Sequence, residues 1–225
     1  MSFSRKEKGF TLIELLVVVS IILIASSIIF TIGKTGVGQS LSISQRIVSG
    51  LVQGARAQAL LKSSKVRLII HNDPSEIDKY RRLVGIMYQG ADASGADGWI
   101  AANQGTYLPE GIYFDAASSA AESGSSWSVS NVFNVEFPLL TAQAGSSGKE
   151  FYYYEFDSNG TLESPNPWLV LRAAVMIPGA DGVDELRINE DLEYLRSALI
   201  LRRSGSTTLV EEPEAIDDSG GSIDK

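Results

Sequence analysis

The chain has no cysteine and a single histidine, His71, among its 225 residues. Without cysteine there is no disulfide framework, no thiolate nucleophile and no cysteine-ligated metal site. One histidine excludes every metal or catalytic scheme that needs two imidazoles. The sequence also lacks a G-x-x-x-x-G-K-[ST] phosphate loop, a G-x-S-x-G elbow and an H-E-x-x-H pair. We therefore expect no enzymatic activity, no cofactor and no metal centre.

Basic residues are also in the minority, with 19 Lys and Arg against 27 Asp and Glu, which gives a formal net charge of −8. Binding to nucleic acid needs Lys and Arg side chains that displace counterions from phosphates. The basic pair Arg202-Arg203 is followed closely by the acidic segment 211–225. Nucleic acid is therefore not expected as a partner.

One long apolar run lies near the N-terminus. Residues 10–32 read FTLIELLVVVSIILIASSIIFTI, with Glu14 as the one charged residue. At about 1.5 Å per residue, a helix of this length can cross a hydrocarbon core of about 30 Å. The basic stretch Arg5-Lys6-Glu7-Lys8 precedes the run. Positive residues at this place keep their end in the cytoplasm, so the chain after residue 32 is expected to be exported.

An ordinary secretory signal peptide is the alternative interpretation of this segment. Its apolar part spans about 7–15 residues and ends at a small-residue cleavage site. Here the run is longer, no clean A-x-A site closes it, and Glu14 lies near its start. A carboxylate at membrane depth costs about 2–3 kcal/mol and needs a partner. Cleavage between Gly9 and Phe10 would create such a partner, a new amine four residues before Glu14.

The stretch Lys8-Gly9-Phe10-Thr11-Leu12-Ile13-Glu14-Leu15-Leu16 resembles the type III signal of type IV pilins and type II secretion pseudopilins. The resemblance implies that prepilin peptidase cuts after Gly9 and methylates Phe10, and that Glu14 recruits the subunit into a filament. It also implies other major and minor pilins or pseudopilins, an inner-membrane assembly platform and membrane lipid as partners. The implied location is the inner membrane, crossed once, with the N-terminus cytoplasmic and the C-terminal domain periplasmic, and afterwards the filament.

The pattern of the chain predicts an α+β fold, in which a long N-terminal helix packs on an antiparallel β-sheet domain, as in pilins. Glycines at 33, 36 and 38 predict a flexible joint in the helix at the membrane surface. Beyond them, several apolar residues share one helical face, namely Val37, Leu41, Val48, Leu51, Val52, Ala55 and Ala59. The expected segments are a leader peptide (1–9), a transmembrane half of the helix (10–32), an amphipathic half (33–64), an exported β-rich domain (65–210) and an acidic flexible tail (211–225).

The β-rich domain begins where β-branched and aromatic runs replace the helical period. Strands are predicted over 66–70, 82–88, 111–114, 133–137, 150–156, 168–176, 198–203 and 207–210. Asn159-Gly160 predicts a hairpin after 150–156. Residues 91–130 are rich in Ala, Ser and Gly and are expected to form long surface loops apart from a strand or two.

Two short segments of this domain, Phe156 to Gly160 and Leu201 to Gly205, resemble the H-type (FimT-like) minor pseudopilins. This resemblance implies a minor pseudopilin of a type II secretion pseudopilus, with a structural role in protein secretion. A minor type IV pilin for pilus assembly or adhesion has the same leader and stays open as the alternative. Trp99 and Trp127 are the candidates for an adhesive face.

Two further possibilities concern charged and titratable residues. An anchored periplasmic enzyme would need a pocket with converging titratable groups, which the sequence does not indicate. His71 is expected at a strand end before a turn, as a surface or packing residue without a carboxylate partner. Several acidic residues cluster late in the chain and leave calcium binding open, although their spacing does not match an EF-hand; they are Asp181, Asp184, Glu185, Glu190 and Asp191.

Overall fold

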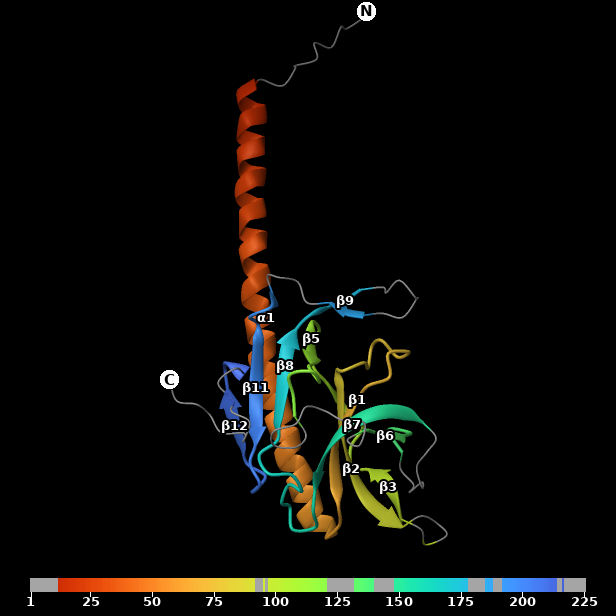
Figure 1. Cartoon of the computed structure of the whole chain (residues 1–225). Helices are drawn as coiled ribbons and strands as arrows, with labels where there is room; N and C mark the ends of the chain where they lie inside the picture. The colour runs from red at the N-terminus through yellow and green to blue at the C-terminus, as the bar shows by residue number, and fades with distance from the viewer. Residues whose placement is uncertain are drawn as a thin grey trace, which may run out of the picture.

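The computed structural model describes residues 12–91, 95, 97–120, 132–139, 148–177, 185–187, 192–213 and 216. For Glu14 and residues 21–35 the structure describes the helical backbone but not the side chains. Within these ranges the chain forms an α-helix followed by antiparallel β-sheets (Figure 1). The α+β class expected from the sequence is therefore confirmed.

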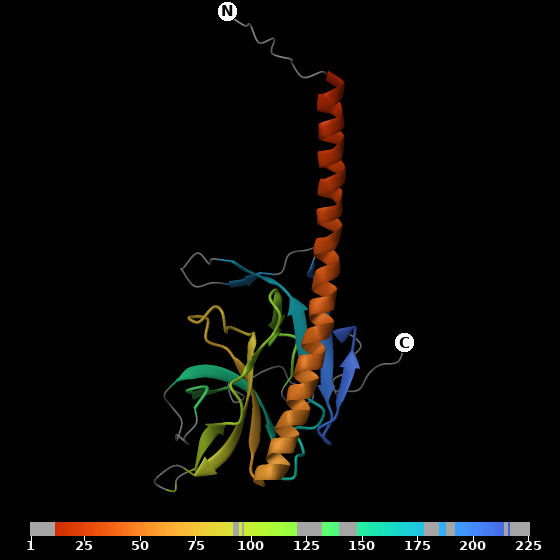
Figure 2. The ribbon, with the colours of Figure 1, turned by 180° about the vertical axis from the view of Figure 1, so that it is seen from behind.

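The helix α1 spans Leu12–Lys62 and runs unbroken through the glycines at 33, 36 and 38. The flexible joint predicted there is wrong for this structure. A helical glycine costs only about 1 kcal/mol relative to alanine, which is too little to end a long helix. The helix ends before Ser63, whose φ of 49° is left-handed. Figures 1 and 2 show that the N-terminal half of α1 projects beyond the β-sheets and that its C-terminal half lies against them.

The first sheet has the strand order β3-β2-β1-β7-β6, and β4 pairs with β2. Every pair in it is antiparallel. The strands are β1 (Val66–His71), β2 (Leu83–Ala91), β3 (Asp97–Ala101), β4 (Thr106–Tyr107), β6 (Val132–Val135) and β7 (Lys149–Phe156). The strands β3 and β4 lie inside the segment 91–130 that was predicted to be mostly loop. They form because β2 is long enough to pair with both of them. A composition rich in Ala, Gly and Ser gives no indication of this pairing.

The second sheet has the order β12-β11-β8-β5, with antiparallel neighbours throughout. Its strands are β5 (Ile112–Phe114), β8 (Trp168–Ala173), β11 (Arg196–Leu201) and β12 (Thr207–Val210), and a separate hairpin joins β9 (Val175–Ile177) to β10 (Glu185–Arg187). The predicted strand 168–176 is thus divided at Ala174. Ile216, inside the segment expected to be a flexible tail, packs against the buried residues of β8, β11 and β12.

The chain folds back at Asn159-Gly160 as predicted, and Phe156 pairs antiparallel with Leu162 in a single bridge, but the pairing goes no further and β8 belongs to the other sheet. In this turn, Asp157 N donates a hydrogen bond of 2.8 Å to the Thr161 carbonyl. Gly160 has a φ of +71°, and a Cβ on it would lie 2.9 Å from Cγ of Arg56. The glycine therefore lets a left-handed turn approach α1 before the chain crosses to the second sheet.

The core lies between α1 and both sheets. The buried apolar residues described on α1 are Leu41, Val48, Val52, Ala55 and Ala59, with Val37 and Leu51 partly buried beside them. They contact buried residues of β1, β2, β5, β7, β8 and β11 in one cluster. A second cluster lies on the opposite face of the first sheet and contains Ile69, Met87, Val135 and Phe151. Since side chains alternate along a strand, β1 turns Leu68 and Ile70 toward α1, and Ile69 and His71 away from it.

Candidate functional site

The residues predicted for processing and assembly lie at or beyond the start of the described structure. Gly9 and Phe10 lie outside the described residues. Glu14 lies in the first turn of α1, and its side chain is not described. The roles of all three residues stay predictions. The acidic cluster 181–191 and Trp127 fall almost entirely outside the described residues as well, so the calcium and adhesion hypotheses stay untested there.

The start of α1 carries an exposed apolar surface. The side chains of Leu12, Ile13, Leu15, Leu16 and the three valines 17–19 are between 47% and 82% exposed. Contiguous exposed apolar residues of this kind indicate contact with another protein or with a membrane. Among the residues that the structure describes, no helix combines the length and the apolar character needed to cross a membrane.

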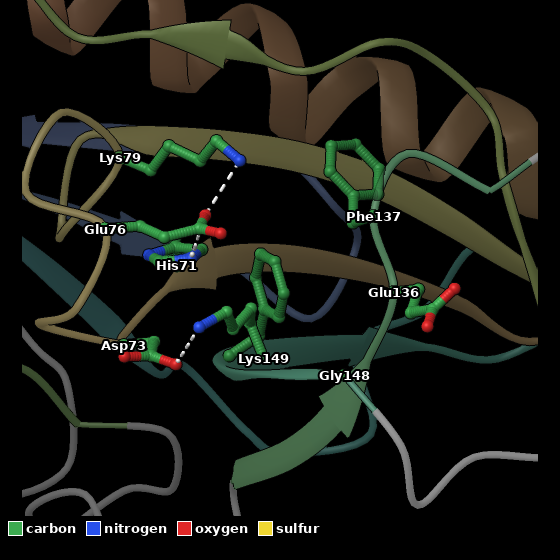
Figure 3. A pocket seen from close by; sticks show the side chains of 9 residues that line it. His71, Asp73, Glu76, Lys79, Glu136, Phe137, Gly148 and Lys149 are labelled. Atoms are coloured by element: carbon green, nitrogen blue, oxygen red, sulfur yellow. Dashed lines mark ion pairs between the residues drawn. The ribbon is translucent and has the colours of Figure 1, made fainter.

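A pocket of about 410 Å³ lies at the end of β1, on the face of the first sheet that points away from α1 (Figure 3). Its walls come from three parts of the chain: the end of β1 and the turn after it, the segment after β6, and the start of β7. The lining residues are His71, Asp73, Glu76, Lys79, Glu136, Phe137, Gly148, Lys149 and Phe151. The pairing of β1 with β7 places His71 directly opposite Phe151 and brings these distant segments together.

Two ion pairs form part of the pocket wall, as Figure 3 shows. Lys79 Nζ lies 2.7 Å from Glu76 Oε2, and Lys149 Nζ lies 2.9 Å from Asp73 Oδ2. Hydrogen bonds from Ser75 and Lys149 lower the pKa of the Asp73 carboxyl far below its usual range. The hydrogen bond from Lys79 lowers the pKa of Glu76 and raises that of Lys79 itself. Asp73, Glu76 and Lys79 therefore keep their charges across the neutral range.

His71 is 1% exposed, and its Nε2 lies 3.4 Å from Glu76 Oε2. The expectation that it lacks a carboxylate neighbour is wrong, because the turn after β1 folds Glu76 back over the strand end. Its position at a strand end before a turn is as predicted. The ring packs edge-on against Phe151, with 5.0 Å between the ring centroids. Burial lowers the pKa of His71, so the imidazole is neutral near pH 7.

A second group of side chains lies on the same sheet face around Arg67, and we call it the Arg67 cluster. The guanidinium carbon of Arg67 lies 4.2 Å from the ring centroid of Trp99, 4.6 Å from that of Phe133 and 3.9 Å from that of Tyr153. Trp99, a candidate for an adhesive face, thus packs within this cluster and is half-buried. Burial acts to raise the pKa of Glu155, but hydrogen bonds from Lys65 and Arg67 outweigh it and hold that pKa below its usual value.

Sequence reasoning missed the pocket and the Arg67 cluster for the same reason. Both depend on the pairing of β1 with β7, which brings together residues 80 or more positions apart in the chain, as with Arg67 and Glu155. The one local signal was the pattern His71-Asn72-Asp73-Pro74, which indicates a polar turn directly after a buried strand. The pair Arg202-Arg203 lies at the turn between β11 and β12, where Arg202 Nε donates a hydrogen bond to Thr208.

Comparisons with known proteins give one match. The family model described as the prokaryotic N-terminal methylation motif matches residues 4–30, a segment that includes Gly9, Phe10 and Glu14. No curated protein and no solved structure matches the chain. The matched motif supports a prepilin-type, type IV pilin-like protein, one that prepilin peptidase processes and that assembles with other pilins.

Proposed function

We propose that this chain is a minor pseudopilin of a type II secretion pseudopilus, with a structural and non-catalytic role in protein secretion. Prepilin peptidase cuts it after Gly9 and methylates Phe10. The N-terminal helix then anchors it in the inner membrane, with the β-rich domain on the periplasmic side. Glu14 pairs with an N-terminal amine during assembly, and the start of α1 packs among the helices of other subunits.

The N-terminal methylation motif over residues 4–30 is the observation that carries this proposal. The exposed apolar surface of α1 from Leu12 to Val19 supports it, since such a surface is stable only against lipid or against other apolar helices. The arrangement of α1 supports it too: its C-terminal half is buried against the sheets, whereas its N-terminal half projects away from them and is free to pack elsewhere (Figure 2).

The H-type assignment rests on the turn after β7 and the hairpin between β11 and β12. Both turns approach the same place on α1, because a Cβ on Gly160 or on Gly205 would meet the side chain of Arg56. A minor type IV pilin in pilus assembly or adhesion is the second candidate. The pocket at the end of β1 favours it, since a ligand site has more use on an adhesive subunit than on a purely structural one.

N-terminal mass analysis of the full chain, expressed with and without a prepilin peptidase, tests the processing step. We expect a mature chain that starts at N-methylated Phe10, made only in the presence of the peptidase. The Gly9→Ala variant should stay uncut, because a side chain at the cleavage position obstructs the peptidase. The Glu14→Ala variant should be cut normally and yet be absent from sheared filaments.

Leu15→Ala is a matched control for Glu14→Ala, since it truncates a neighbouring exposed side chain of α1 without removing a charge. An uncut wild-type chain, or a cut beyond residue 25, would contradict the proposal. Deleting the gene and scoring secreted enzyme activity and surface pili separately distinguishes the two candidates. Lost secretion with normal pili supports the pseudopilin, and the reverse supports the pilin.

A further inference from the structure

The pocket at the end of β1 contains a buried polar group that the described part of the chain does not satisfy. Among the residues that the structure describes, neither Nδ1 nor Nε2 of His71 has a hydrogen-bond partner, although the side chain is 1% exposed. The contact with Glu76 at 3.4 Å falls short of a hydrogen bond. Buried polar atoms are nearly always paired, so an unpaired imidazole that lines a pocket is placed to receive a hydrogen-bond partner from a molecule bound there.

The charges of the lining favour a cation over an anion. Lys79 and Lys149 are already paired with Glu76 and Asp73, and Lys149 also donates a hydrogen bond of 2.8 Å to Ser75. A bound anion would have to compete with these carboxylates. Within the described part of the chain Glu136 forms no ion pair, although it lines the same pocket and is exposed. With His71 neutral, this leaves the lining with one carboxylate in excess.

The aromatic residues that line the pocket indicate a ligand with an apolar stem as well as a cationic group. Figure 3 shows Glu136 on one side of the pocket and His71 with Glu76 on the other, while the ring of Phe137 lies on the side facing Lys79. Phe137 and Phe151 both line the space and contact each other, with 6.0 Å between the ring centroids. Aromatic rings accept both a hydrocarbon chain and a nearby cation. The volume of about 410 Å³ lies within the usual range for small-molecule sites.

We propose that this pocket binds an aliphatic ammonium group whose stem carries a second hydrogen-bond donor at its far end. The ammonium pairs with Glu136, the stem lies along Phe137 and Phe151, and the second donor reaches the lone pair on the unprotonated nitrogen of His71. Two sources have this chemistry, a free diamine and a lysine side chain with its backbone amide. The site is separate from the N-terminal motif and does not depend on the filament role proposed above.

Titration calorimetry on the full chain in detergent solution tests this site with four probes. These are 1,5-diaminopentane, Nα-acetyl-lysine N-methylamide, n-pentylamine and pentanoate. We expect the first or the second to bind with a dissociation constant of about 1 mM, which is reasonable for so small a ligand. Whichever of the two binds more tightly identifies the source. Pentylamine should bind less tightly because it lacks the second donor, and pentanoate should not bind.

The variants Glu136→Gln and His71→Phe test the two ends of the site. Glu136→Gln should weaken binding of the better amine about tenfold or more, because it removes the charge partner. The control Glu110→Gln removes an exposed carboxylate outside the pocket and should leave the affinity unchanged. His71→Phe should reduce the affinity of the diamine to that of pentylamine. Since Glu136 is exposed, its variant folds normally, and a circular-dichroism spectrum verifies this.

Three results would overturn the proposal. One is the absence of saturable binding by either bifunctional amine, which would mean that water satisfies His71. Another is equal amine affinity in the wild type and in Glu136→Gln. The third is preferential binding of pentanoate, which would show that the lysines and not Glu136 decide the ligand.

Discussion

Arg67 and Glu155 lie directly opposite each other on β1 and β7, and Arg67 Nε donates a hydrogen bond of 2.7 Å to Glu155 Oε2. The Glu155 side chain is 6% exposed, so its charge depends on Arg67 and on Lys65 at the edge of the same face. The aromatic rings around Arg67 exclude water from the pair. A charged residue near the start of β1 is thus compatible with a buried sheet face.

The variant Arg67→Ala should lower the free energy of unfolding by about 3 kcal/mol. Removing one member of a buried pair leaves the other charge without compensation, and the three rings lose their common contact. Urea denaturation followed by circular dichroism measures the change. Arg46→Ala, which truncates an exposed arginine of α1, should change it by no more than about 0.5 kcal/mol. Similar values for the two variants would show that the Arg67 cluster contributes little.

The free energy of unfolding should decrease as the pH is lowered below neutral, because of His71. Its pKa is lowered by burial in the folded chain, whereas in the unfolded chain it keeps its usual value of 6.5. Below that pH the unfolded state binds a proton that the folded state does not, so the free energy of unfolding decreases as the pH falls. Asp73 and Glu76 have lowered pKa values and stay ionised in both states from neutral pH down to about 5.5.

The variants His71→Phe and His71→Gln should both remove the difference in stability between about pH 7.5 and about pH 5.5, because neither side chain titrates. Urea midpoints at the two pH values measure it. Phenylalanine keeps the edge contact with Phe151, and glutamine keeps a polar group in the pocket. Agreement between the two variants would therefore show that protonation of His71, and not its packing, causes the pH dependence. A pH dependence that persists in both would assign it to other groups.

Gly148 should tolerate no side chain. Its φ is +122°, and a Cβ there would overlap the carbonyl of Val135. Gly148→Ala should therefore cost about 2 kcal/mol or more, since both the backbone conformation and the contact are affected. Gly95→Ala is the control, because Gly95 has a φ of +82° with open space around the Cβ position, and only the conformational part of about 1 kcal/mol applies. Thermal denaturation compares the stability of the two variants. Equal destabilisation would contradict the close approach of Gly148 to Val135.

The buried stripe of α1 should contribute strongly to stability. Val52 is fully buried between the helix and the sheets, whereas Leu61 is 74% exposed on the same helix. Val52→Ala removes two buried methyl groups and should cost about 2 kcal/mol. Leu61→Ala deletes more atoms but should change the free energy of unfolding by less than about 0.5 kcal/mol. Urea denaturation compares them, and a larger effect of Leu61→Ala would contradict the packing of α1 seen here.

The correctly predicted strands are those that can be recognised from the composition of their own residues. Val66 to His71 and Thr207 to Val210 are rich in β-branched or apolar residues and are bounded by turn residues, so neighbours in the chain are enough to identify them. Asp97 to Ala101 has no such pattern and becomes a strand because it pairs with β2. The glycines of α1 show the converse, since a local helix-weakening signal does not interrupt a helix of 51 residues.

By itself, the sequence determined the N-terminal motif, the apolar run after it and the α+β class, because each depends on residues that are neighbours in the chain. Only the tertiary structure decided that Asn159-Gly160 joins two sheets, that Glu76 folds over His71, and that Glu136 and Lys149 share a pocket with them. These relationships depend on the pairing of β1 with β7 across about 80 residues. Antiparallel pairing over such a separation is set by how the whole core packs, which no local pattern contains.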